Sequence, residues 1–408
     1  MTELAQLETL VDDFEYENDD KTIVLTLSLR TTFYFWGGHT DSVRSALTDC
    51  IEAYQSRFGA ELKWGYQAEG RSFPSYQKLP SLRSMLAKLD RDDQIEWHVS
   101  SADNTEACGH YEISALTERG WQSNQISVVT FLLPREYAFE PEKQKTVLEL
   151  IELFAVKLKP FHGHSGLCAT SVYEQYQYQP DEFDVATKFR GIYIEDMTID
   201  SNETPRGIKG VDWLTYIGKD FAERVGGLPV LLKRLQADAI DHRSLSDGVL
   251  IATGLKPEIV PVAEENPESV VKVNAVLRPF RNGSFGGMAF GSSDGILRFT
   301  RYLADLWMRR FDQKDIWPPA LKLARTFPKA PACVPPEKKV KLKSGEACTV
   351  HGRYSLPKLG FKFDDEKNDP VAQVVLLPGD IAPYWLALGP HGELKSRDAV
   401  TWELRCEL

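Results

Sequence analysis

The sequence of 408 residues is poor in cysteine and has no closely spaced cysteine pair. Its six cysteines lie far apart, which excludes the spacing of a zinc ribbon or a thioredoxin-like redox motif. The first twenty residues carry eight acids and no Lys or Arg, whereas a secretory signal needs a basic start followed by an apolar run. No apolar stretch is long enough to cross a bilayer. Together these absences predict a cytoplasmic protein with reduced thiols.

An excess of basic charge is also absent. Lys and Arg number 48 against 59 Asp and Glu, so the formal net charge is -11. Such a balance disfavours binding to a phosphate backbone, which selects basic surfaces. It serves solubility first, and it also allows fast capture of a basic partner. We therefore expect no direct binding to nucleic acid.

Motifs for nucleotide binding or nucleophilic catalysis are incomplete. A nucleophile elbow around Ser165 would need glycine at position 167, which is leucine. The Gly218-Lys219 pair is followed by Asp220, where a P-loop needs Ser or Thr. The glycines within residues 285–291 do not match the dinucleotide fingerprint. The dispersed polar residues predict a binding protein without catalytic residues, cofactor or metal.

Three short groups could still carry chemistry. His162 and His164 could bind a metal, but no carboxylate is apparent near them in the sequence, so a turn with ordinary histidines is favoured. The Glu195-Asp196 pair could serve acid–base chemistry or a metal, and a solvated face is favoured because neighbouring side chains point apart. Cys108 lies close to a histidine in the sequence, but a small buried cysteine is the favoured interpretation.

The acidic N-terminal segment has two interpretations. It is either a frayed, soluble arm or a decoy that occupies the basic active site of a partner, and the arm is favoured. If the segment binds a partner, the contact residues are its acids: Asp12, Asp13, Glu15, Glu17, Asp19 and Asp20.

Hydrophobic periodicity predicts an α+β fold, with a mixed or antiparallel sheet and packed helices. Alternation predicts strands over residues 21–36 and 125–133, and helical spacing predicts helices over 41–58 and 141–158. Residues 161–178 are rich in glycine and small residues, and we interpret them as a helix packed closely on the sheet. The order of strands and helices is typical of an α+β layer.

Proline marks a change in organisation near the C-terminal end. Two proline clusters and a shift in charge predict a linker over residues 316–340. We expect an α+β domain over 1–315 and a small, mainly β domain over 341–408.

One longer segment, residues 206–218, reads Arg-Gly-Ile-Lys-Gly-Val-Asp-Trp-Leu-Thr-Tyr-Ile-Gly. With residues 221–227 after it, this segment resembles the central motif of the type VI immunity family. The aromatic run at 33–36, the turn at 161–166 and the segment 248–257 are similar to the same family pattern, so the resemblance covers about residues 20–280. Two stretches of the tail, 344–348 and 378–383, also resemble a small module that follows such domains.

The resemblance implies an immunity protein that binds and neutralises a type VI secretion effector. The effector is expected to be a nuclease of the restriction-endonuclease-like kind, silenced by a blocked active site or by blocked self-association. The resemblance carries no catalytic residues. The glycines of the motif are interpreted as turns and helix ends, and Trp213, Leu214 and Ile217 as core. An effector-loading adaptor or chaperone and an unrecognised hydrolase remain as alternatives.

Overall fold

A computed structural model describes residues 3–67, 72–123, 125–173, 175–288, 295–319, 330–331, 333–357 and 372–408. Its centre is a large sheet of ten strands in which every neighbouring pair is antiparallel. Across the sheet the strands are β3 (Trp64–Gln67), β4 (Glu96–Ser100), β5 (Glu112–Leu116), β6 (Ser127–Pro134), β2 (Ile23–Phe35), β7 (His162–Ser171), β8 (Leu214–Gly218), β10 (Gly248–Ala252) and β9 (His242–Leu245), with the short β1 (Tyr16–Glu17) beside β2.

Strand β2 is the longest strand in the described residues and lies between β6 and β7. Its aromatic and β-branched residues favour an extended chain. Successive side chains point to opposite faces, so Phe33 and Phe35 join the apolar core on one face while Thr32 and Tyr34 lie on the other. The strand predicted over 21–36 is therefore confirmed.

The helix expected within residues 161–178 is wrong, because residues 162–171 form the buried strand β7. This strand pairs with β2 on one side and with β8 on the other. Its small residues suit a crowded position, since a Cβ at Gly163 would lie 2.6 Å from the Phe33 ring. Small residues alone do not distinguish a close-packed helix from a central strand, and here the pairing partners decide.

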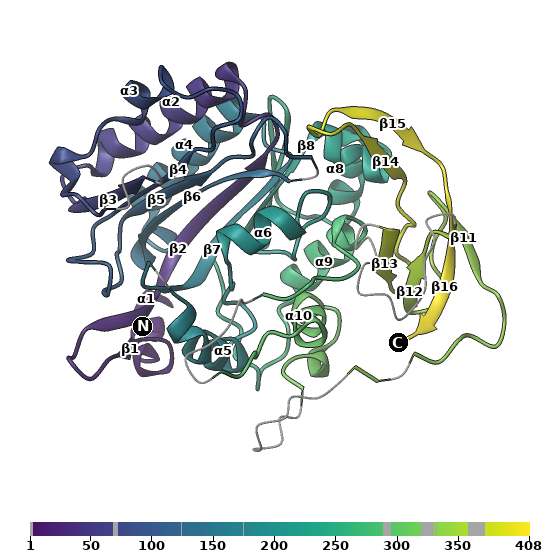
Figure 1. Cartoon of the computed structure of the whole chain (residues 1–408). Helices are drawn as coiled ribbons and strands as arrows, with labels where there is room; N and C mark the ends of the chain where they lie inside the picture. The colour runs from purple at the N-terminus through teal and green to yellow at the C-terminus, as the bar shows by residue number, and fades with distance from the viewer. Residues whose placement is uncertain are drawn as a thin grey trace.

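Two long helices cover the apolar face of the sheet. The ends of α2 (Asp41–Phe58) and α4 (Pro141–Leu158) agree with the predicted ranges, and Thr40 occupies the N-cap position of α2. Figure 1 shows α2, α3 and α4 along one side of the sheet and α6 in front of β7. The helices are α1 (Glu3–Glu8), α2 (Asp41–Phe58), α3 (Leu82–Leu86), α4 (Pro141–Leu158), α5 (Gln179–Lys188), α6 (Met197–Glu203), α7 (Lys219–Ala222), α8 (Leu228–Ala237), α9 (Glu268–Leu277) and α10 (Arg301–Met308).

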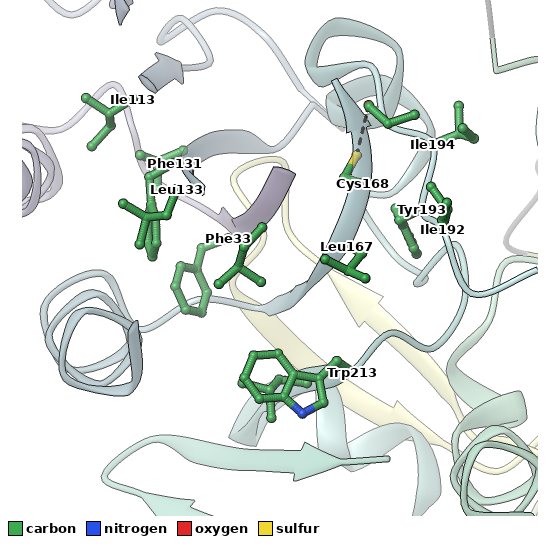
Figure 2. Close-up of a cluster of buried hydrophobic side chains, with 14 of the residues drawn as sticks. Phe33, Ile113, Phe131, Leu133, Leu167, Cys168, Ile192, Tyr193, Ile194 and Trp213 are labelled. Carbon is green, nitrogen blue, oxygen red and sulfur yellow. Dashed lines mark hydrogen bonds between the residues drawn. The ribbon is translucent and has the colours of Figure 1, made fainter. Parts of the chain in front are cut away.

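The main core lies between this sheet face and α2 and α4. Phe33 packs against Phe154 of α4, with ring centroids 6.1 Å apart, and Phe131 packs against the same ring at 5.2 Å. In Figure 2, Phe33 lies between Leu167 and the group that contains Phe131 and Leu133. Trp213, Leu214 and Ile217 are buried as expected for the 206–218 motif. Gly226, which ends a helical turn, and Gly227, which caps the start of α8, have φ values of +105° and +97° that favour glycine.

The C-terminal part is β-rich, as predicted. One sheet has the order β11 (Lys341–Lys343), β16 (Thr401–Glu407), β12 (Gly352–Ser355) and β13 (Gln373–Leu376), and β14 (Trp385–Leu388) pairs with β15 (Leu394–Asp398). Leu386 joins a core cluster of the preceding region, and Arg353 pairs with Asp305 of α10 at 2.9 Å. The division into 1–315, a linker at 316–340 and 341–408 stays a prediction; within the linker, residues 320–329 and 332 lie outside the described residues.

Candidate functional site

A row of neighbouring side chains crosses the face of the sheet that points away from α2 and α4. Register places these residues beside one another on successive strands. Their hydroxyl and imidazole groups bond to one another: His98 Nδ1 lies 2.6 Å from Ser114 Oγ, and Thr32 Oγ1 lies 2.9 Å from Thr130 Oγ1. From the β3 edge inward, the row is Tyr66, His98, Ser114, Thr130, Thr32 and His164.

The inner half of this row lies beneath the segment that leads into α6. Glu195 of that segment accepts hydrogen bonds from the hydroxyls of Thr32 and Tyr34, each at 3.0 Å. Asp196, next to it, is the N-cap of α6 and accepts from two backbone N–H groups of the first turn. Both acids are buried. The interpretation of Glu195-Asp196 as a solvated face is therefore wrong, because one side chain faces the sheet and the other caps a helix.

His164 also has carboxylate partners that its neighbours in the sequence do not reveal. Its Nδ1 lies 3.1 Å from Asp212, and its Nε2 lies 3.7 Å from Glu195. Burial alone would lower the pKa of His164, but the two carboxylates raise it to about 9. The pKa of Glu195 falls to about 2 against the penalty of burial, because His164, Arg30 and Lys209 are close. The interpretation as a turn with ordinary histidines is wrong: the imidazole is a buried cation on a central strand.

The 206–218 motif holds this network together. Its Asp212 faces Gly166 so closely that a Cβ there would lie 1.7 Å from the carboxylate. Its Lys209 is buried, pairs with Asp200 of α6 at 2.7 Å and donates to the backbone carbonyl of Ile194 at 2.8 Å. A buried ammonium needs such partners. The motif therefore supplies charges that fasten the segment leading into α6, and α6 itself, to the sheet.

The outer half of the same row forms the floor of an open cleft of about 480 Å³. Four acids and one arginine are among the described residues that line it. The arginine, Arg30, is held by Glu195, whose carboxylate lies 3.8 Å away. The four acids are Glu96, Glu112, Glu195 and Asp196.

One wall of the cleft is aromatic. The rings of Tyr66, Phe73 and Tyr173 contact one another, with centroids 5.4 to 5.7 Å apart. His98 extends the wall and lies 4.6 Å from Tyr173. Phe73 is 43% exposed, which is high for such a large apolar side chain. Exposed aromatic side chains beside charged groups are typical of protein interfaces.

The cleft contains polar atoms that the described residues leave unsatisfied. His98 is 7% exposed, and its Nε2 has no hydrogen-bond partner among them. Burial lowers the pKa of His98 to about 3, so the ring is neutral. Burial also raises the pKa of Glu112 to about 7, against the opposing effects of Ser100 and Arg30. This carboxylate lies where a charge is costly without a cation nearby.

The acids of the N-terminal segment do not form a frayed arm in the described residues. Phe14 is fully buried among them, and β1 of the segment pairs with the first residues of β2. Three of the six candidate acids have partners within the chain: Asp13 lies 3.3 Å from Lys188, Glu15 accepts from Thr26 at 2.9 Å, and Glu17 lies 3.5 Å from Lys21. The exposed members are Asp12, Glu17, Asp19 and Asp20.

Among the described residues, the remaining candidate groups are not arranged for catalysis or for metal binding. Burial raises the pKa of the Cys108 thiol, which donates to the carbonyl of Thr170 at 3.3 Å. Within the described residues, no three His, Cys, Asp or Glu side chains are placed to hold a metal ion. No helix in the same part of the chain has the length and apolarity to cross a bilayer. Residues 289–291 of the glycine-rich segment lie outside the described residues.

These features define a protein built around an internally paired polar centre, with an acidic, aromatic-walled cleft on its surface. Residues 46–311 match a family described as TsiV, type VI immunity for VRR-NUC. This match spans more than half of the chain, and the chain belongs to that family. It is a type VI immunity protein against a VRR-NUC effector, a restriction-endonuclease-like nuclease, and it acts as an inhibitor rather than an enzyme. The implied family and partner are thereby confirmed, in preference to an adaptor or a hydrolase.

A solved structure supports the assignment. The chain is similar to the Pseudomonas aeruginosa type VI secretion system protein PA0821, with 27% sequence identity and a TM-score of 0.66. The similarity covers 76% of this chain and 90% of that protein. Among curated proteins, no match is found.

Proposed function

We propose that the chain silences its effector by covering the DNA-binding active site of the nuclease with the open half of the sheet, in the cytoplasm of the producing cell. The observation that carries this proposal is the cleft, where Glu96, Glu112 and the exposed ring of Phe73 lie on one surface. A nuclease binds the phosphate backbone through basic side chains. An acidic, concave surface is complementary to such a site and competes with DNA for it.

Charge over the whole molecule favours the same orientation. With a net charge of -11, the protein attracts a basic surface from a distance and repels nucleic acid. The acids of the N-terminal segment would contribute to this attraction from the edge of the interface. Blocked self-association of the nuclease is the second mode, but it requires no acidic surface, so the cleft favours occlusion.

A competition experiment tests the mode of inhibition. The cognate effector is first identified by pull-down from the native strain with mass spectrometry. DNA cleavage and binding of a labelled duplex are then measured as this protein is added. Occlusion predicts that inhibition and loss of DNA binding follow the same titration, and that excess DNA slows formation of the protein complex. A stable ternary complex that retains DNA would contradict it.

A further inference from the structure

We infer that the cleft accepts an arginine side chain from the partner nuclease; this assignment rests on the proposed function and makes it more specific. The cleft combines three elements on one surface: carboxylates on the floor, an aromatic wall, and a buried imidazole with a free nitrogen. An aliphatic or anionic side chain would leave the carboxylates without a partner. A cation satisfies them and also stacks on the wall.

The carboxylates that remain for a partner can be identified. Glu195 is occupied by Arg30, His164 and two hydroxyls of the sheet. Glu112 accepts from Ser100 Oγ at 2.7 Å through one carboxylate oxygen. With Glu96, it lies on the open half of the floor. Register places Glu96 opposite Leu116 and Glu112 opposite Ser100, so β4 and β5 each contribute one carboxyl group to the cleft.

The aromatic wall distinguishes arginine from lysine. The rings of Tyr66, Phe73 and Tyr173 pack against one another, so they present a continuous surface and not a cage around a point charge. A planar guanidinium stacks on such a surface while its N–H groups reach carboxylates beside it. Arginine has several donors but no acceptor. The neutral His98 lines the cleft and is an acceptor at Nδ1 or Nε2, depending on its tautomer; Nδ1 is bonded to Ser114, whereas Nε2 is buried and has no partner among the described residues.

The test uses the full chain and the cognate nuclease. The dissociation constant of the complex is measured for the wild type, for a variant that combines Glu96→Gln with Glu112→Gln, and for Phe73→Ala. Each cleft variant is expected to weaken binding at least tenfold, mainly through faster dissociation. The matched controls, Glu142→Gln on α4 and Leu255→Ala, alter an exposed acid and an exposed leucine outside the cleft and should change binding less than twofold. Thermal unfolding of each variant confirms the fold.

Substitution on the nuclease then identifies the side chain. Each arginine and lysine of its DNA-binding surface is changed to glutamine, and the affinity is measured against the wild-type chain and against Glu112→Gln. One arginine is expected to lose its effect when Glu112 is neutral. Unchanged binding by the cleft variants, or coupling to a lysine or to no cation, would overturn the inference. If the wild-type chain itself fails to inhibit the nuclease, the proposed function fails instead.

Discussion

Two halves of one sheet face differ in how their polar side chains are satisfied. In the inner half, the segment 193–200 lies over the sheet and its Glu195 contacts Thr32, Tyr34 and His164. In the outer half, the same register row continues through Thr130, Ser114 and His98 but faces a cleft. Charges in the inner half have partners from the same chain and stabilise it. Those in the outer half are left for a partner, which is how a stable scaffold and a binding surface share one sheet.

Removing a charge from the inner half is expected to have the largest effect. Asp200→Ala leaves the ammonium of Lys209 buried without its carboxylate. We expect the free energy of unfolding to fall by about 3–5 kcal/mol, the usual cost of breaking a buried pair. Chemical denaturation measures this loss. The outer-half variant Glu96→Gln should change stability by less than about 0.5 kcal/mol, and an equal loss in both variants would remove the distinction between the halves.

The pH dependence of stability should also come from the inner half. Burial opposes protonation of His164, but Glu195 and Asp212 raise its pKa to about 9 in the folded protein, above the usual value of about 6.5 in an unfolded chain. Its contribution, roughly 3 kcal/mol, is fully present below pH 6.5 and is lost as the pH rises towards 9. Denaturation of wild type and His164→Gln between pH 6 and 10 measures it. A variant with the same slope as the wild type would contradict the assignment.

Removing a charge from the outer half should stabilise the fold, whereas removing one from the inner half should destabilise it. Burial raises the pKa of Glu112 to about 7 in the folded protein, so its ionisation costs stability as the pH rises from about 4.5 to 7. Glu112→Gln removes this cost while keeping the shape. We expect the variant to be more stable than the wild type by about 1–3 kcal/mol at pH 8 and similar to it at pH 4. Lower stability at pH 8 would show that the carboxylate serves the fold.

The smallest effect is expected for the acids of the N-terminal segment, at the edge of the proposed interface. Combined Asp12→Asn, Asp19→Asn and Asp20→Asn substitutions remove three exposed acids. We expect the association rate with the nuclease to fall by no more than about threefold at low salt, with the dissociation rate unchanged, because exposed charges steer encounter. Stopped-flow kinetics at two salt concentrations measures this. A loss comparable to that of the cleft variants would move the contact surface to the N-terminal segment.

The sequence alone predicts a helix or strand where the residues of that element mark its beginning and its end. Helix α4 begins at Pro141 and ends at Leu158, the range that helical periodicity and a first-turn proline predict. For strand β7 the sequence pattern predicts a helix, because Gly163 and its small neighbours suit either element, and only pairing with β2 and β8 makes it a strand.

The site was harder to predict than the fold. Glu112 and Phe73 lie far apart in the sequence and have no shared motif, so nothing local indicates that they line one cleft. Glu195 and Asp212 likewise give no sign that they pair with His164, because 31 and 48 residues separate them from it along the chain (195 minus 164, and 212 minus 164).

By itself, the sequence determined the α+β class, the ends of the long helices, the acidic charge and, through residues 206–218, the family. Those properties follow from composition, periodicity and contiguous residues, which are present in the chain before it folds. Tertiary structure alone decided which acids are paired within the chain and which remain open at the cleft. A carboxylate's burial and partners depend on the strands brought beside it, and these come from distant parts of the chain.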